Sequence, residues 1–185
     1  MNNLRRMFWV INHFFMVPAF RLGFGPVMGT PFGGYIMVIK TVGHKTGKLR
    51  WTPVNYAIQD GSVYCLAGFG RIAHWYQNIK ARSNIELMLP STALAAEAQE
   101  VPHSLARLTI LRKILVNSGF AAFAFGFNPF TISDSALQEK TQDYIVLRMR
   151  PHGIGSGAAD PGGRLWLSAT LVTIAAIWLL ILVFT

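Results

Sequence analysis

An uncharged apolar run closes the chain and restricts its architecture more than any other feature. Residues 165–184 read LWLSATLVTIAAIWLLILVF and contain no charged side chain. A helix of that length rises about 30 Å, which is about the thickness of the hydrocarbon core of a bilayer. The alternative is a helix buried in a protein core, but such a helix is rarely apolar on every face. We therefore expect one C-terminal transmembrane helix, a membrane anchor, at residues 165–185.

The charges beside this run predict its orientation. Arg148, Arg150 and Arg164 precede it, and no charged residue follows it. Because cytoplasmic loops carry an excess of Lys and Arg, we expect a single-pass protein of the cell membrane with its soluble domain in the cytoplasm. Residues 152–164 are rich in Gly and Pro, which predicts a flexible linker.

The charge balance indicates an anionic partner. The chain has 17 Lys and Arg against 8 Asp and Glu, a formal charge of +9. Such a charge attracts nucleic acid, anionic lipid or anionic small molecules. The basic residues are dispersed and no nucleic-acid module is recognisable, so we expect no nucleic acid. The single cysteine, Cys65, excludes an intramolecular disulfide.

The first 29 residues predict an amphipathic helix. Apolar side chains recur at helical spacing, and they are Leu4, Met7, Phe8, Ile11 and Phe15. Charged residues interrupt the run and no small-residue cleavage site follows, so a secretory signal is not expected. Two placements stay open: the helix covers the domain, or it lies on the membrane surface.

Between these ends, residues 30–151 predict an α+β domain. Residues 60–61 are Asp-Gly, a strong hairpin signal between two strand patterns. The expected strands are 35–41, 52–59, 62–67, 85–89, 93–101 and 143–150, and the expected helices are 73–82 and 104–117. Mostly antiparallel strands with helices between them favour a small barrel or a strongly curled sheet.

Two glycine-containing stretches carry the candidate chemistry. Residues 41–53, TVGHKTGKLRWTP, place four basic side chains around a glycine turn. Such a turn is either a phosphate cradle or a solvated hairpin tip. Residues 66–78, LAGFGRIAHWYQN, run from a strand through small residues into a helix. They leave room for a flat ring beside the backbone, although Trp75 and Asn78 also fit plain packing roles.

Taken together, the two stretches resemble the deazaflavin-dependent nitroreductase family, a branch of the split β-barrel (FMN-binding-like) flavin and deazaflavin oxidoreductases. The resemblance covers about residues 30–151. The first motif is matched by Gly43, His44, Lys45, Thr46, Gly47, Arg50 and Pro53, and the second by Ala67, Gly68, Phe69, Gly70, Trp75 and Asn78. Two positions depart from the family pattern. His44 stands where Arg is usual, and Phe69 where some members have a polar or basic residue.

The resemblance implies a binding site for a deazaflavin coenzyme, F-420. Lys45, Thr46 and Arg50 would hold its phosphate and acidic tail, with His44 and Gly47 in the same turn. Thr52, Pro53 and Val54 would line the ring, Ala67 to Gly70 would present backbone groups to it, and Trp75 and Asn78 would support that wall.

The implied substrate pocket is closed by the N-terminal helix and residues 119–129. Candidates to line it are Tyr56, Tyr76, Phe123 and Phe125, for each of which plain packing is the alternative. The coenzyme supplies the hydride, so no catalytic side chain or metal cluster is expected.

The resulting hypothesis is a membrane-anchored reductase. It transfers a hydride from reduced deazaflavin to a lipophilic quinone or nitro-type acceptor, with the lipid bilayer as a partner. Alternatives are a non-catalytic docking module of a larger membrane complex, or the same barrel binding FMN or haem. A homodimer is expected by analogy with split barrels.

Overall fold

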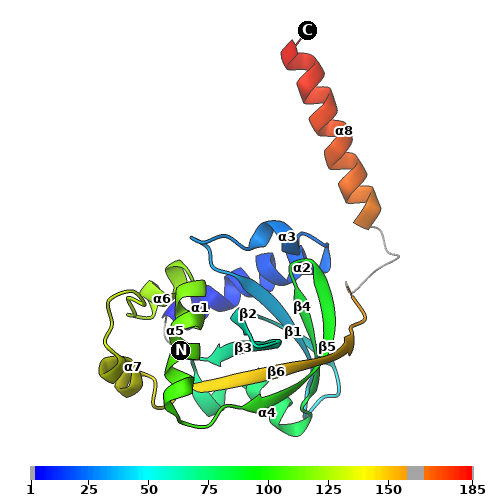
Figure 1. Ribbon diagram of the computed structural model, residues 1–185. Helices are drawn as coiled ribbons and strands as arrows, with labels where there is room; N and C mark the ends of the chain where they lie inside the picture. The colour runs from blue at the N-terminus through cyan, green and yellow to red at the C-terminus, as the bar shows by residue number, and fades with distance from the viewer. Residues whose placement is uncertain (1–2, 158–164, 185) are drawn as a thin grey trace.

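A computed structural model of the chain describes residues 3–157 and 165–184 (Figure 1). The side chains of residues 3–5, 105, 165, 166, 168, 183 and 184 are not described. Residues 158–164, in which most of the predicted linker falls, lie outside the described residues.

Six antiparallel strands form a closed barrel. They run in the order β1-β2-β3-β6-β5-β4, and β4 pairs with β1 to close it. The strands are β1 Ile36–Val42, β2 Leu49–Gln59, β3 Ser62–Ala67, β4 Asn84–Leu89, β5 Thr92–Glu100 and β6 Ile145–Ile154. All six predicted strands are confirmed, although β2 begins three residues earlier than expected and β6 continues past residue 150. The α+β class and the barrel are therefore confirmed.

The Asp60-Gly61 turn fixes the β2–β3 register as the sequence predicted. Both residues have positive φ, +48° and +68°. This is the conformation of a type I′ turn, whose twist matches that of the flanking strands. Gln59 consequently pairs with Ser62 across the hairpin.

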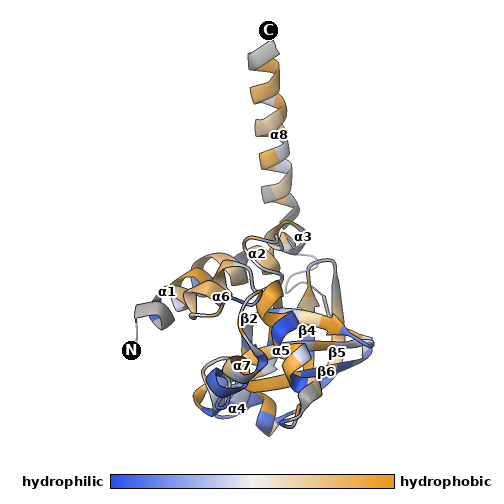
Figure 2. Cartoon of the chain, turned by 60° about the vertical axis from the view of Figure 1, so that its left-hand side comes forward, coloured by the Kyte–Doolittle hydropathy of each residue, from blue (hydrophilic) through white to orange (hydrophobic). Residues whose placement is uncertain are grey.

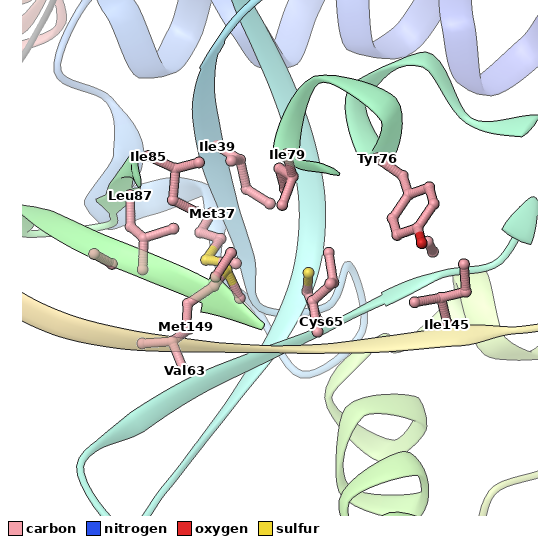
Figure 3. Packing of buried hydrophobic residues seen from close by; sticks show 14 of the residues in the cluster. Met37, Ile39, Val63, Cys65, Tyr76, Ile79, Ile85, Leu87, Ile145 and Met149 are labelled. Atoms are coloured by element: carbon pink, nitrogen blue, oxygen red, sulfur yellow. The ribbon is translucent and has the colours of Figure 1, made fainter. Parts of the chain in front are cut away.

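The barrel interior is filled by apolar side chains from every strand and from helix α4 (His74–Ala81). Figure 3 shows Met37 and Ile39 of β1, Met149 of β6 and Cys65 of β3 among the side chains of this cluster. Ile79 and Tyr76 reach the same cluster from α4. This core fixes α4 against the barrel, which matters because α4 carries part of the site.

The N-terminal segment is broken into several helices, whereas the sequence predicted one. These are α1 Asn3–Ile11, the π-helical turn η1 Asn12–Met16, α2 Val17–Arg21 and α3 Gly25–Met28. Pro18 lacks an N–H and its ring crowds the preceding turn, so a regular helix does not continue through this region. Gly23, at φ +82°, ends the run.

This segment packs on the outside of the barrel. Met16 and Phe20 form an apolar cluster with Val38 of β1 and Met88 of β4. Its outer side carries exposed apolar residues, and Figure 2 shows α1 and α2 largely in hydrophobic colours. The segment therefore packs on the domain through Met16 and Phe20, and contact of its exposed outer side with a membrane surface stays a prediction.

Further helices cover another part of the barrel surface. They are α5 Leu105–Asn117, α6 Phe120–Ala124 and α7 Asp134–Lys140. Apolar residues of α5 and α7 pack against Tyr64 and Val146 on the outer face of β3 and β6. Helices α4 and α5 confirm two predictions, while α6, α7 and the short turn η2 (Gly70–Ile72) were not predicted.

The C-terminal helix α8 spans Leu165–Phe184, where a helix was expected. Within the described part of the chain, no helix combines the length and apolarity needed to cross a membrane. The transmembrane part of the prediction is therefore not confirmed. Before α8, the stretch predicted as a linker begins inside β6, and the N–H of Gly155 donates to Ala93 O of β5.

Candidate functional site

A cleft of about 720 Å³ opens beside the barrel. Its walls come from the β1–β2 turn, the first half of β2, the loop after β3, α4, the C-terminal end of α5, α6 and the N-terminal helices. The barrel therefore supplies one side, and the surrounding helices supply the rest.

The cleft follows a gap in the strand pairing. The first half of β2, Leu49 to Asn55, pairs with β1, whereas its pairing with β3 begins only at Tyr56. Pro53 lies in this singly paired half, where a residue without an N–H is tolerated. The free side of the strand lines the cleft with Arg50, Thr52 and Val54.

The β1–β2 turn forms the polar end of the cleft. Gly43 O accepts hydrogen bonds from Thr46 N and Gly47 N, and Gly43 N donates to Lys48 O. A Cβ at Gly43 would lie 2.8 Å from Thr46 Oγ1 and 3.3 Å from Lys48 O, so a larger residue would force the Thr46 side chain to move. The compact turn directs His44, Lys45 and Thr46 to the cleft.

Asn78 ties this turn to helix α4. Its Oδ1 accepts from His44 N at 3.0 Å and lies 2.9 Å from His44 Nδ1. Its Nδ2 donates to Thr41 Oγ1 at 3.2 Å. Asn78 is buried, so these bonds are shielded from water and fix the turn relative to α4. The spacing of Trp75 and Asn78 places both on the helix face toward the cleft, as the sequence indicated.

The polar end is cationic. Lys45 and Arg50 line it and are exposed. Neither takes part in an ion pair within the described residues. No carboxylate lines the described walls of the cleft. Their charge therefore acts on whatever occupies this end.

The opposite wall offers flat, accessible backbone. A Cβ on Gly68 would meet only Tyr144 Cε2, at 3.9 Å. Phe69 and Trp75 line the same wall. Burial raises the pKa of Tyr144, so its phenol is neutral at physiological pH and remains a hydrogen-bond donor.

Aromatic rings cover the apolar end. Phe8 of α1 stacks on Phe125 with centroids 5.5 Å apart, and Phe69 approaches Phe125 edge-on at 6.0 Å. Trp9 and Asn12 also line the cleft from the N-terminal segment. Both segments that were expected to close the pocket therefore do contribute to its walls.

Most of the residues predicted to bind the coenzyme lie around this one cleft. They are His44, Lys45, Thr46, Arg50, Thr52, Pro53, Val54, Gly68, Phe69, Trp75 and Asn78. Gly47 shapes the turn with φ +65°, and Gly70 likewise has a positive φ, +57°. Ala67 is buried in the barrel core. These three do not line the cleft.

Of the four residues predicted for the substrate pocket, one lines the cleft. Phe125 lines the cleft, but Tyr56, Tyr76 and Phe123 do not. Tyr76 belongs to the barrel core, and its hydroxyl donates to Glu100 on β5. It follows Trp75 by one residue, a rotation of about 100° around the helix, which turns it away from the cleft. Tyr56 packs against the barrel core, and Phe123 is exposed.

Sequence reasoning missed part of the lining. Within the two segments expected to close the pocket, it did not single out Phe8, Trp9, Asn12, Ala121 and Phe127. Elsewhere it missed Trp51, Asn55, Leu66, Ala73, His74, Ile114, Leu115, Ser118 and Tyr144. Those on β2 adjoin predicted positions and were recoverable from the strand. Those at the end of α5 and beyond depend on tertiary packing and carry no local signal.

Comparison with protein families identifies the chain. The family described as F420H(2)-dependent quinone reductase matches residues 17–124, more than half of the chain. The chain belongs to this family. The match includes the β1–β2 turn, β2 and α4, which form the cleft described above. Family membership implies an F-420-dependent oxidoreductase and gives no support to FMN as the coenzyme.

Solved structures add only weak likenesses. An F420-H2 dependent reductase (FDR-A) is 21% identical, with 63% of this chain and 93% of that chain covered and a TM-score of 0.44. A putative 5-nitroimidazole antibiotic resistance protein from Bacteroides thetaiotaomicron is 9% identical, with coverage of 74% and 78% and a TM-score of 0.48. The haem storage protein HutZ from Vibrio cholerae is 13% identical, with coverage of 64% and 82% and a TM-score of 0.46. Among curated proteins, no sequence matches this chain.

Proposed function

We propose that this protein reduces a lipophilic quinone or nitro-type acceptor with a hydride from reduced F-420, bound in the cleft. One observation carries the proposal: a single cleft joins a cationic turn to an apolar, aromatic chamber. That division matches a ligand with an anionic tail and a planar ring.

The residues present fit such a coenzyme. Lys45, Arg50 and Thr46 would hold the phosphate and acidic tail through charge-assisted hydrogen bonds. The space above Gly68 admits a flat ring close to the backbone. Thr52 and Val54 lie on the free edge of β2 opposite.

The bound coenzyme supplies the hydride. The chain's contribution is to position both reactants and to exclude water, since Phe8, Phe69 and Phe125 cover the apolar end. Tyr144 lines the cleft, and its neutral phenol would donate a hydrogen bond to an oxygen of the acceptor. No group of residues suited to a metal ion occurs in the described chain.

The test is binding of the coenzyme to the purified full chain, measured by the quenching of deazaflavin fluorescence. Lys45→Ala with Arg50→Ala removes two charge-assisted bonds, each worth about 1.5–3 kcal/mol, so we expect affinity to fall at least a hundredfold. Lys48→Ala is the matched control, because Lys48 carries the same charge on the same turn but does not line the cleft. Undiminished binding by the double variant overturns the proposed site.

The acceptor is tested separately. Reduced coenzyme should be oxidised by menadione or a menaquinone analogue in the presence of the protein. A water-soluble quinone of similar potential should react more slowly, because the walls near Phe125 are apolar. Equal rates with both would argue against a lipophilic acceptor.

We also propose that the protein works at the cytoplasmic face of the cell membrane, anchored by one pass of residues 165–185. The proposal rests on the uncharged run and on the exposed apolar residues of the N-terminal segment, which are Met7, Trp9, Val10, Ile11, Phe14, Phe15, Leu22, Phe24 and Val27. The double variant Ile174→Arg with Ile177→Arg should be released from membranes on carbonate washing, since each central arginine opposes insertion by about 2.5–3.5 kcal/mol. Release of the unmodified chain by the same wash would contradict the anchor. The expected homodimer also remains a prediction.

A further inference from the structure

His44 stands at the cationic end of the cleft with one ring nitrogen already engaged. Both its backbone N–H and its ring Nδ1 approach Oδ1 of Asn78, at 3.0 and 2.9 Å. Its Nε2 makes no hydrogen bond to any described residue. Since Nδ1 is held at Asn78, Nε2 is the ring nitrogen left to contact a ligand in the cleft.

The backbone settles which ring nitrogen carries the proton. A backbone N–H is always a donor, so the Asn78 atom that faces it must be the amide oxygen. The other end of the amide then donates to Thr41 Oγ1 at 3.2 Å, which agrees with this orientation. An amide oxygen only accepts, so His44 Nδ1 must be protonated to bond it. Neutral His44 is therefore held as the Nδ1–H tautomer, with a lone pair on Nε2.

The permanently charged groups that share the cleft with His44 are cationic. The titratable and charged groups that share the cleft with His44 are Lys45 of the same turn, Arg50 of β2, His74 of α4 and Tyr144 ahead of β6. The N-terminal segment contributes only uncharged side chains, Phe8, Trp9 and Asn12. Two permanent cations and no carboxylate line this part of the cleft within the described residues, so its charge favours a phosphate or carboxylate as the ligand.

We propose that His44 binds the anionic tail of the coenzyme only in its doubly protonated form, so that coenzyme binding takes up one proton from solution. Asn78 acts as the positioning residue that presents Nε2–H to the ligand. This inference rests on the proposed function, because it takes the coenzyme as the occupant of the cleft. Lys45 and Arg50 supply affinity at every pH, and His44 makes it depend on pH.

The sign of the effect follows from linkage. A ligand that prefers protonated His44 binds more tightly when that form is abundant, so affinity falls as pH rises. Histidine changes charge between about pH 5 and 8, so the change belongs in this interval. One linked proton allows at most a tenfold change in the dissociation constant per pH unit, and we expect about tenfold in total.

The first experiment needs no coenzyme. In the full chain labelled with ¹⁵N-histidine, long-range proton–nitrogen correlations at pH 8.5 should show His44 mainly as the Nδ1–H tautomer. Asn78→Leu should shift it toward the Nε2–H tautomer that free imidazoles prefer, and His74 should be unaffected. A His44 mainly in the Nε2–H form in the unmodified protein overturns the proposal.

The second experiment measures the dissociation constant of the coenzyme from pH 5.5 to 8.5, and proton uptake by calorimetry in two buffers of different ionisation enthalpy. His44→Arg should bind tightly with the proton-linked change removed, and His44→Gln should bind weakly across the range. His74→Gln is the matched control, since it removes another histidine of the cleft and should keep the pH dependence. A titrating group of the coenzyme itself affects all four proteins alike.

The outcomes separate the two ideas. No binding at any pH defeats the proposed function and this inference with it. Binding whose pH dependence is unchanged in His44→Arg leaves the function standing and refutes the role of His44. Uptake of close to one proton by the unmodified chain, lost in His44→Arg, supports it.

Discussion

A buried ion pair next to the cleft allows a stability prediction worked from the structure. Lys40 Nζ lies 2.7 Å from Glu86 Oε1, and only 7% and 18% of these side chains are exposed. Ser156 Oγ contacts both, at 2.6 Å from Lys40 Nζ and 2.8 Å from Glu86 Oε2. Lys40 Nζ also lies 5.0 Å from the ring centroid of Trp51, which lines the cleft. The network links β1 to β4 through Lys40 and Glu86, and it ties Ser156, which follows β6, to both strands.

Breaking this pair from one side should be costlier than removing it whole. Loss of one partner of a buried pair destabilises by about 3–5 kcal/mol, because the remaining charge is left without compensation. Glu86 keeps its bond from Ser156 and some solvent, so for Lys40→Met we expect about 2–3 kcal/mol. In a chain of this length that lowers the midpoint of thermal unfolding by about 4–12 °C. Lys40→Met with Glu86→Leu leaves no buried charge and should lose at most about 1 kcal/mol.

The pH dependence follows from Glu86. Burial acts to raise its pKa, but hydrogen bonds from Lys40 and Ser156 and the lysine charge outweigh burial and lower the pKa. A carboxyl with a lowered folded-state pKa contributes stability above its unfolded pKa of about 4.3, and that contribution is lost as pH falls through the folded value. The unmodified protein should therefore lose more stability between pH 6 and 3 than Glu86→Gln does.

The assay is urea unfolding of the full chain, monitored by far-ultraviolet circular dichroism at pH 6 and pH 3, for the four members of the double-mutant cycle and for Glu86→Gln. A coupling free energy near zero at pH 6 would refute the reasoning. So would a double variant as unstable as Lys40→Met. Either result would mean that the charges are hydrated in solution.

Three further predictions concern single residues. Gly119→Ala should destabilise the protein by about 3 kcal/mol or more in thermal melting, because φ is +54° and the new Cβ would collide with Phe32 O. The control is Gly47→Ala, whose Cβ meets open space at φ +65°, so the protein should lose only about 1 kcal/mol. Phe8→Ala removes the stack on Phe125 and should raise the KM for a quinone several-fold with unchanged coenzyme affinity; the same change at exposed Phe14, which does not line the cleft, should do neither. Cys65 is fully buried and burial raises the pKa of its thiol, so a thiol reagent at pH 8 should label it only after urea unfolding; rapid labelling of the native chain would contradict its place in the core.

The barrel was predictable because its signals are local. Alternating apolar residues mark the strands, and Asp60-Gly61 fixes one register through backbone conformation alone. Short helices are harder to predict. Helix α6 follows Gly119, which reads as a loop glycine, and its five residues are too few to show a period. Helix α7 did carry a signal, since Ser133 caps it by accepting from Ala136 N, but the segment was not recognised as a helix start.

The site was predictable where one element carries it. The β1–β2 turn and the first half of β2 are contiguous in sequence, so the motif places Lys45, Arg50 and Thr52 together. Residues on the opposite side come from α1, α5 and the region beyond, and their convergence depends on packing. Tyr76 shows that sequence reasoning can fail by one position within a helix. It was predicted to line the pocket, but it lies one residue after Trp75 and faces the barrel core.

The two ends of the cleft rest on different parts of the molecule, and this separation constrains how the function can change. The cationic end is braced internally: Asn78 ties the turn to α4, and α4 is fixed by the barrel core. The apolar end depends on Phe8 and Phe125, which lie outside the barrel in segments joined by ring contacts. Substitutions in the N-terminal segment can thus alter which acceptor enters without disturbing the turn. Substitutions at Asn78 should instead disturb coenzyme binding first, because that side chain alone connects His44 to the rigid part of the fold through hydrogen bonds within the described chain.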